Sequence, residues 1–355
     1  MEKVTVKTIA QACNVSIGTV DRALNGRGRI SPETQRKILE TAEELGYHRN
    51  HLASVLGKQR KYRIAVLSPS QPSSFFHFVD EGVREAQKEL LDYGITVEQI
   101  HTHFLNYEEQ LEALNSIDKS KYDGLVLTAS SEKLIEPLNT FVDAGIPVVT
   151  FNSDARTSRR LFFVGEDAYK SGRMCASLMG RILGGKGRVA VLVSYLHPGS
   201  PADRIRGFVD VMKSDYPGIE LLEPREYKER EEAAMQLLDE ILEEYGRLDG
   251  VFANSASGTV GIGRYFSKGQ PDKPMLVGYD VTPEVEGYLK SGVCDLIVDQ
   301  NPEKQSYYGV TLLGKHLMEK WKPQVDQLEI RVKLVMRDNV DDYSPEKNRD
   351  EHILL

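Results

Sequence analysis

The chain has 355 residues, of which 40% are hydrophobic and 28% charged, as in a globular protein of about two or three domains. No apolar run approaches about 18 residues and no signal-peptide core is present, so we expect a cytoplasmic protein without a membrane span. The net charge is -8, yet residues 1–63 hold 12 Lys and Arg against 6 Asp and Glu. A cationic segment therefore precedes an acidic remainder.

Residues 4–47 predict short helices that surround a tight turn. Thr5 and Ser16 are expected to cap the first and second helices, because their hydroxyls can accept hydrogen bonds from the first turn. Asn14 lies between these helices and tolerates the left-handed conformation that such a turn requires. The periodicity predicts a buried face that includes Ile9, Ala10, Val20 and Leu24.

A third helix is predicted from Ser31-Pro32-Glu33, which combines a capping hydroxyl, a proline at the first helical position and an acidic first turn. It carries Ile38, Ala42 and Leu45 on one face and is expected to end at Gly46. Three such helices form a helix-turn-helix module whose second helix fits a DNA major groove. A three-helix bundle without a DNA-binding role is the alternative.

The residues Val15-Ser16-x-x-Thr19-Val20-x-Arg22-x-Leu24-Asn25, followed by Ser31, Thr34 and Leu45-Gly46-Tyr47, resemble the headpiece of the LacI/GalR family of bacterial repressors. The resemblance implies that Ile17, Gly18 and Arg22 face the bases. Arg22 can form a bidentate pair with guanine, and Ile17 can contact a thymine methyl group. Gly18 offers almost no contact, and Asp21 replaces the small hydroxyl residue usual in the family.

Residues 48–61 are polar apart from a short stripe of Leu52, Val55 and Leu56, too short for a stable isolated helix. The segment resembles the family hinge, which folds when two copies meet on the operator and inserts a leucine into the minor groove. Leu56 matches that leucine, and a flexible linker is the alternative. The predicted DNA-binding residues are Thr5, Ser16, Ile17, Gly18, Thr19, Arg22, Asn25, Arg29 and Leu56. Further basic residues, among them Arg36 and Lys37, are candidates for phosphate contacts.

From residue 62 onward, apolar strands alternate with amphipathic helices. We predict strands at 62–68, 94–100, 123–128, 146–151, 161–164, 187–194, 218–222, 249–254, 274–279 and 294–298. Helices are predicted at about 76–92, 107–117, 131–144, 168–183, 202–214, 229–244, 258–267, 283–290 and 303–320. This alternation indicates an α/β fold with two doubly wound parallel-sheet lobes. Ligands of such lobes bind beyond the carboxyl ends of the strands.

This region resembles the periplasmic-binding-protein type I core. We expect a headpiece at 1–47, a hinge at 48–61, a core at 62–340 and a polar tail at 341–355. The first lobe is expected to comprise about 62–164 and 293–325, and the second about 165–292 and 326–340. The tail lacks the heptads that a tetramerising coiled coil needs. The family resemblance implies a homodimer.

The resemblance also implies a ligand site between the lobes. Phe75 and Phe76 match aromatics that stack on a sugar ring, or they belong to the core. Asn152 and Asp280 match hydrogen-bonding residues at strand ends, or they cap turns; Arg204 matches a ligand-binding arginine, or it makes a surface ion pair. The predicted ligand-binding residues are Ser73, Phe75, Phe76, Asn152, Arg204, Ser255, Asp280 and Gln300.

Departures from the family pattern disfavour ribose as the ligand. Asn152-Ser153 replaces the Asp-Arg of ribose binders, and Ser255 occupies the place of an amide. Glu166 could bind a further hydroxyl or an amine, although an ordinary loop carboxylate is the simpler interpretation.

Other motifs lack the residues that a phosphate, metal or catalytic site requires. The glycine-rich stretch 180–187 lacks the hydroxyl residue of a phosphate-binding loop. His101 and His103 lack further ligands nearby, and the three cysteines lie far apart, so no metal or cofactor site is predicted. No paired nucleophile and base indicates an enzyme.

The sequence therefore predicts a transcriptional regulator in which a homodimer binds a double-stranded DNA operator under control of a sugar-like effector. A solute-binding protein for transport is the alternative. A sugar-modifying enzyme is a third class, disfavoured by the missing catalytic groups.

Overall fold

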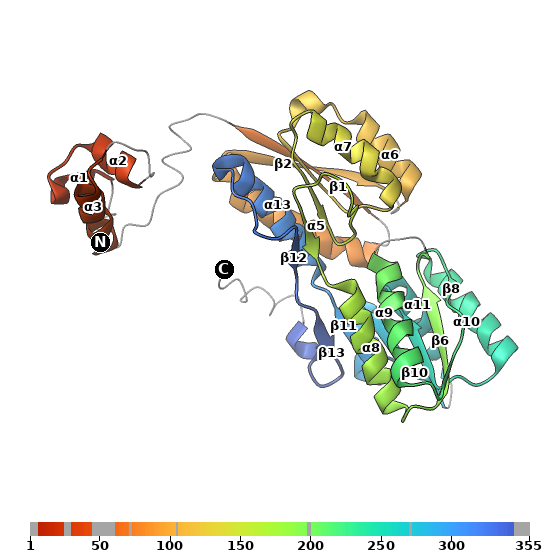
Figure 1. The fold of residues 1–355 in the computed structure, drawn as a ribbon. Helices are drawn as coiled ribbons and strands as arrows, with labels where there is room; N and C mark the ends of the chain where they lie inside the picture. The colour runs from red at the N-terminus through yellow and green to blue at the C-terminus, as the bar shows by residue number, and fades with distance from the viewer. Residues whose placement is uncertain are drawn as a thin grey trace. The chain divides into compact units, whose positions relative to one another are not determined.

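The computed structural model describes residues 6–24, 30–44, 61–70, 73–103, 106–196, 200–269 and 272–343. These belong to two compact units that divide between Arg60 and Lys61 (Figure 1). Within the described residues, no helix combines the length and apolar character that crossing a bilayer requires.

The N-terminal unit contains α1 (Val6–Cys13), α2 (Ile17–Leu24) and α3 (Pro32–Glu44). Asn14 has a φ of 55° in the turn between α1 and α2, which confirms the left-handed turn. Ser16 Oγ accepts a hydrogen bond from the Thr19 amide at 3.1 Å, and Ser31 Oγ accepts one from the Thr34 amide at 3.1 Å. The buried core contains Ile9, Ala10, Cys13, Val20, Ala23, Ile38 and Ala42.

The first lobe of the C-terminal unit is built on a six-stranded sheet in the order β12-β5-β4-β3-β1-β2, in which all neighbours are parallel. The strands are β1 (Tyr62–Pro69), β2 (Ile95–Thr102), β3 (Gly124–Leu127), β4 (Val148–Phe151), β5 (Phe162–Gly165) and β12 (Gln327–Glu329). The helices are α5 (Ser73–Leu91), α6 (Tyr107–Ser116), α7 (Ile135–Asp143) and α13 (Pro302–Glu319), with 3-10 turns at Lys119–Lys121 and Glu132–Leu134.

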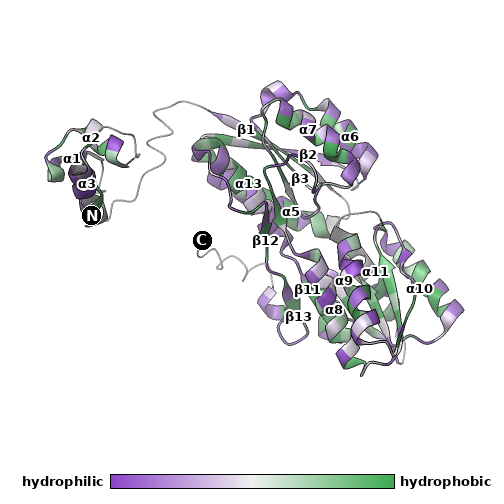
Figure 2. Ribbon diagram, viewed as in Figure 1, coloured by the Kyte–Doolittle hydropathy of each residue, from purple (hydrophilic) through white to green (hydrophobic). Residues whose placement is uncertain are grey.

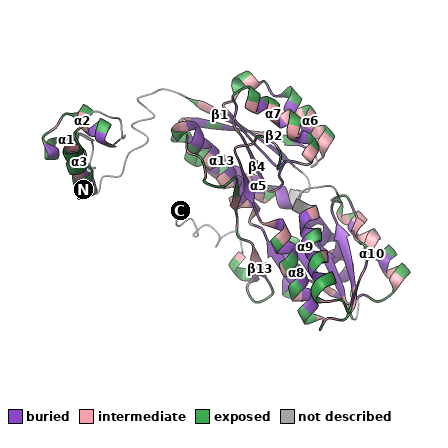
Figure 3. Cartoon of the chain, viewed as in Figure 1, coloured by how far each residue is buried: buried purple, intermediate pink, exposed green. Residues whose placement is uncertain are grey.

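Alternate residues of β1 pack on opposite faces of this sheet. Ile64 and Val66 belong to the cluster formed with α5 and α13, whereas Ala65 and Leu67 belong to the cluster formed with α6 and α7. Because both faces are covered, β3, β4 and β5 are buried throughout their length, whereas the edge strands β2 and β12 are partly exposed (Figure 3). Hydrophobic residues accordingly follow the strands, and hydrophilic residues lie on the outer faces of the helices (Figure 2).

The second lobe contains a seven-stranded sheet with the path β13-β11-β10-β9-β6-β7, and β8 pairs with β6. The strands are β6 (Gly187–Val193), β7 (Ile219–Leu221), β8 (Arg225–Glu226), β9 (Gly250–Ala253), β10 (Met275–Tyr279), β11 (Leu296–Asp299) and the antiparallel β13 (Lys333–Val335). The helices are α8 (Ala168–Ile182), α9 (Ser200–Asp215), α10 (Glu231–Tyr245), α11 (Ala256–Phe266) and α12 (Pro283–Ser291), and a 3-10 turn follows at Val340–Tyr343.

All ten predicted strands are present, and the α/β fold class is confirmed. The predicted lobe boundaries were partly wrong. Strand β11, assigned to the first lobe from residue 293, pairs with β10 in the second sheet. Strand β12, assigned to the second lobe from residue 326, pairs with β5 in the first sheet. The chain thus leaves the second lobe after β11. Strands β8, β12 and β13 were missed because two or three residues show no usable alternation.

Candidate ligand site and DNA-binding surface

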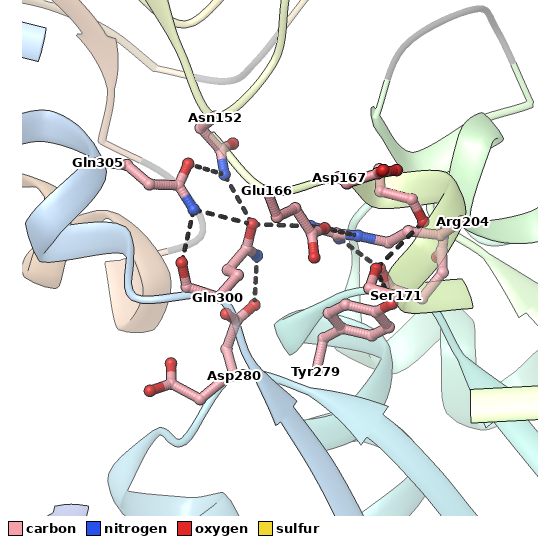
Figure 4. Close-up of polar contacts among 12 residues, drawn as sticks. Asn152, Glu166, Asp167, Ser171, Arg204, Tyr279, Asp280, Gln300 and Gln305 are labelled. Carbon is pink, nitrogen blue, oxygen red and sulfur yellow. Dashed lines mark hydrogen bonds and ion pairs between the residues drawn. The ribbon is translucent and has the colours of Figure 1, made fainter. Parts of the chain in front are cut away.

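Arg204, on α9, is the centre of a buried polar network (Figure 4). It is 3% exposed. Its Nε lies 2.5 Å from Glu166 Oε1, Nη1 donates to the Asn254 carbonyl at 2.8 Å, and Nη2 donates to Gln300 Oε1 at 2.7 Å. The guanidinium carbon lies 4.1 Å from the centroid of the Tyr279 ring. Burial acts to lower the pKa of Arg204, but the Glu166 carboxylate raises it, so the side chain stays charged.

Gln300 links this network to the first lobe. The Gln300 Oε1 also accepts a hydrogen bond from Asn152 Nδ2 at 3.0 Å. The backbone carbonyl of Gln300 accepts one from Gln305 Nε2 at 2.7 Å. Asn152 follows β4, and Gln305 lies on α13, whereas Gln300 follows β11 of the other sheet. The Gln300 amide therefore bonds to groups from both lobes.

Asp280 follows β10 at the other end of the network. Gln300 Nε2 donates to Asp280 Oδ2 at 3.1 Å. Burial raises the pKa of the Asp280 carboxyl to about 8; Arg204 acts to lower this pKa, and Asp299 acts to raise it. Asp280 Oδ1 and Glu166 Oε2 are buried and have no hydrogen-bond partner among the described residues. Buried acceptors are normally satisfied, so both oxygens are suited to donors from a ligand.

The backbone explains why these side chains converge. Asn152, Asp280 and Asn301 have φ values of 61°, 66° and 55°, and each follows or nearly follows a strand. Asn and Asp adopt this left-handed conformation more readily than other residues with side chains. It turns the chain sharply at the carboxyl edge of each sheet, where ligands of doubly wound folds bind.

Ser255 lies in a second polar cluster on the second lobe. Its Oγ donates to Glu229 Oε2 at 3.1 Å and lies 2.5 Å from the Tyr227 hydroxyl. The Ser257 hydroxyl also donates to the Glu229 carboxylate. Burial raises the pKa of Glu229, while the serine hydroxyls act to lower it. The structure thus pairs Ser255 with a carboxylate, and its link to Arg204 is through the neighbouring Asn254.

Phe75 and Phe76 belong to an apolar cluster of the first lobe. Both are buried in the apolar cluster of α5 and α13, with ring centroids 5.0 Å apart in an edge-to-face arrangement. That cluster also includes Ala256 from the second lobe. The two rings therefore pack as core residues where α5 approaches α11. Only the backbone of Ser73 is described.

Two pockets adjoin the network. A pocket of about 350 Å³ is lined by residues of both lobes. Asp154, Arg156 and Phe163 belong to the first lobe, Glu166 directly follows β5, and Asp203 lies on α9 of the second lobe. A smaller cavity of about 60 Å³ is lined by Asp280, Asp299, α13 and part of α5. The two unpartnered carboxylate oxygens thus belong to residues that line different pockets.

The predicted base-reading surface is exposed at the start of α2. Ser16, Ile17, Gly18 and Arg22 are exposed, and Ile17 is an apolar side chain with 54% exposure. Arg22 Nε donates to the Gly18 carbonyl at 3.0 Å. The Oγ1 atom of half-buried Thr19 lies 2.8 Å from the Ser16 hydroxyl oxygen. Thr5, Asn25, Arg29 and Leu56 lie outside the described residues.

Sequence reasoning left out several participants, among them Asn254, Gln305, Glu229 and Tyr279, and undervalued Glu166. Glu166 and Asn254 directly follow β5 and β9, so the strand-end rule could have identified both. Gln305 occupies an ordinary helical position, and Glu229 follows β8, a strand that was not predicted. Tyr279 lies within β10, and the sequence analysis gave it no role beyond its place in the predicted strand.

Comparison with known proteins gives two matches along the chain. Residues 5–50 match the bacterial regulatory proteins of the lacI family, and residues 64–320 match the periplasmic binding protein domain. The chain is 24% identical to the ribose operon repressor of Bacillus subtilis (strain 168), over 79% of this chain and 82% of that protein. It is 27% identical to the ribose operon repressor of Halalkalibacterium halodurans, over 79% of this chain and 81% of that protein.

The fold also resembles the crystal structure of a glucose-galactose binding protein from Geobacillus stearothermophilus. The TM-score is 0.73 at 24% sequence identity, over 79% of this chain and 99% of that chain, which establishes a shared fold. The chain belongs to the periplasmic binding protein domain family over residues 64–320 and carries a lacI-family regulatory domain at residues 5–50, the combination of a lacI-family transcriptional regulator with a ligand-binding core.

Proposed function

We propose that this regulator binds a roughly palindromic operator as a homodimer and that a small polyhydroxylated molecule between the lobes controls the binding. The observation that carries the proposal is the buried network of Arg204, Gln300 and Asp280, in which Asn152 of the first lobe also takes part. Guanidinium, amide and carboxylate groups together supply the donors and acceptors that hydroxyl groups need.

The network offers a route from ligand to DNA. Asn152 and Gln305 belong to the first lobe, while Arg204 and Asp280 belong to the second. A ligand that bonds to both sets binds one lobe arrangement better than the other, as any shift in equilibrium requires. In a homodimer the change would alter the spacing of the two headpieces, and half-site spacing is a geometric property of helix-turn-helix dimers.

The headpiece supplies base contacts and charge. Ile17 and Arg22 are exposed on α2, where a recognition helix meets base edges. Arg36 and Lys37 are exposed on α3, where phosphate contacts would make affinity fall with salt without adding sequence preference. We propose Thr5, Asn25, Arg29 and Leu56 as further DNA contacts on the family resemblance alone.

The proposal is tested with the full chain. Duplexes are selected from a random library, and their affinity is measured by fluorescence anisotropy with and without sugars, polyols and sugar derivatives that raise the melting temperature. We expect a palindromic preference that responds to at least one stabilising compound. Arg204→Ala should remove the response and retain DNA binding, whereas Arg181→Ala, an exposed arginine on α8, should behave as wild type.

A chain that prefers no duplex would contradict the regulatory proposal. If ligands still stabilised such a chain, the result would favour a solute-binding protein without a transcriptional role.

A further inference from the structure

The interlobe network contains more carboxyl groups than basic groups. Glu166, Asp280 and Glu229 contribute carboxyl groups near one guanidinium, that of Arg204. Arg204 faces Glu166 directly at 2.5 Å. Asp280 receives a hydrogen bond from the Gln300 amide, and Glu229 receives hydrogen bonds from serine hydroxyls. The Glu166 charge is therefore balanced, while the other two carboxyl groups have only neutral donors in direct contact among the described residues.

Asp280 is a buried carboxyl group that combines an unpartnered oxygen with a neutral donor as its direct contact. It is 2% exposed, and its Oδ1 has no hydrogen-bond partner within the described part of the chain. The charges that act on it are Arg204, which favours ionisation, and Asp299 and Glu166, which oppose it. Asp299 itself has Lys333 and Lys304 nearby. A buried anion without a counter-charge is costly, and burial accordingly raises the pKa of Asp280 to about 8.

We infer that the effector is a polyhydroxylated amine whose ammonium group pairs with the Asp280 carboxylate. An ammonium group brings both the missing positive charge and several hydrogen-bond donors. Hydroxyl groups of the same molecule are suited to the amides of the network, whereas Glu166 Oε2, the second unpartnered oxygen, belongs to a residue of the other pocket. A sugar acid or sugar phosphate would instead add an anion beside these carboxyl groups, which disfavours binding. The inference rests on the proposed function, because it names the ligand class of the same site.

The first test is differential scanning fluorimetry of the full chain with matched sugars. D-Glucosamine is compared with D-glucose and D-galactosamine with D-galactose, and D-glucuronate and glucose 6-phosphate serve as anions. We expect at least one amine to raise the melting temperature more than its hydroxyl counterpart, and the anions to give no rise. Equal shifts within both pairs, a larger shift with a hydroxyl or anionic compound, or no shift with either amine would overturn the inference.

The second test is calorimetric titration of the stabilising amine in two buffers of different ionisation enthalpy near pH 7. Binding should release protons, because pairing with the ammonium ionises Asp280. Asp280→Asn should lower the amine affinity by about thirtyfold or more, since one partner of a buried charge pair is lost, and should abolish the proton release. Asp215→Asn makes the same charge change at an exposed site on α9 and should bind as wild type.

An Asp280→Asn chain that keeps both the amine preference and the proton release would also overturn the inference. The proposed function is tested separately. If the chain binds a selected operator and responds to a neutral sugar, the regulatory proposal stands and the inference of an amine effector is wrong.

Discussion

The carboxyl group of Asp280 makes the folding stability of the chain depend on pH. Its pKa is raised by burial to about 8 from an ordinary value of 3.8. For an acid with a raised pKa, the folded protein holds a proton that the unfolded chain has lost. Folding stability therefore falls as pH rises from about 4 to about 8.

We expect Asp280→Asn to raise the melting temperature near pH 8 by a few degrees, about the effect of one or two kcal/mol in a domain of this size. The Asn side chain retains an oxygen for the Gln300 amide and carries no charge. Thermal unfolding from about pH 5 to pH 8 measures the difference, which should shrink toward acid. A difference that stays constant with pH would show that Asp280 is not the titrating group.

Arg22 is the residue on which sequence discrimination should depend. Its Nε donates to the Gly18 carbonyl, so the guanidinium is oriented by its own helix. We expect Arg22→Ala to lower discrimination between operator and random duplex by about 10- to 100-fold, the loss typical of one bidentate base contact. Arg22→Lys keeps the charge and loses the fork geometry, so it should retain salt-dependent binding with reduced discrimination. Competition anisotropy measures both ratios, and unchanged discrimination would refute the assignment.

At the scale of elements, helices α8 and α9 pack so closely that they set the position of Arg204. A Cβ at Gly172 on α8 would lie 2.0 Å from the Arg204 carbonyl, and one at Gly207 on α9 would lie 2.1 Å from the Tyr169 carbonyl. Both contacts involve backbone atoms, so a side chain at either glycine must push the helices apart. The glycines therefore hold α9, and with it the guanidinium, against α8.

We expect Gly172→Ala to destabilise the chain by about 1 to 3 kcal/mol through overpacking, despite the better helix propensity of alanine. It should also weaken ligand binding, because Arg204 moves. Gly287→Ala on α12 is the matched control, since nothing lies within 4 Å of its added Cβ, and it should stabilise by about 0.5 to 1 kcal/mol. Urea unfolding monitored by fluorescence gives both values. Equal effects of the two substitutions would argue against close helix packing.

At the scale of the whole molecule, ion pairs connect the two lobes outside the buried network. Arg156 follows β4 in the first lobe and pairs with Asp203 on α9, which also pairs with Arg206 at 3.0 Å. Lys170 on α8 pairs with Glu329 on β12 at 3.2 Å. These contacts exist only while the lobes hold this arrangement, so they favour it over a more open one.

We expect Lys170→Ala to weaken ligand binding by about two- to fivefold, because a partly exposed ion pair contributes up to about 1 kcal/mol. Lys170 pairs with Glu329 across the lobes and is not among the residues that line the two pockets. The substitution makes the closed arrangement of the lobes less stable and leaves the ligand contacts in place. Arg159→Ala breaks a comparable pair with Asp143 at 2.7 Å within the first lobe and should leave affinity unchanged. Calorimetric titration measures the ligand affinity of both variants. Equal losses of affinity would show that the interlobe ion pair does not act through lobe closure.

Much of this architecture follows from local sequence patterns. The helical caps of Ser16 and Ser31, the turn at Asn14 and the ten strands depend on neighbours a few residues away, so periodicity and turn chemistry predict them. Asn152 and Asp280 were predicted from their places at strand ends, where ligands of doubly wound sheets bind, and the family spacing singled out Arg204 and Gln300. The structure brings all four into one network.

Long-range packing settles the remainder. Asn152 and Gln300 are 148 residues apart in the chain, and no local pattern shows that Gln305 joins them or that Glu229 pairs with Ser255. The sheet that β11 and β12 join depends on which edge is available for pairing. The acidity of Asp280 depends on burial and on Arg204, Asp299 and Glu166. Solvent exclusion and charge proximity are properties of the folded chain, and they set the charge and the hydrogen-bonding capacity of this network.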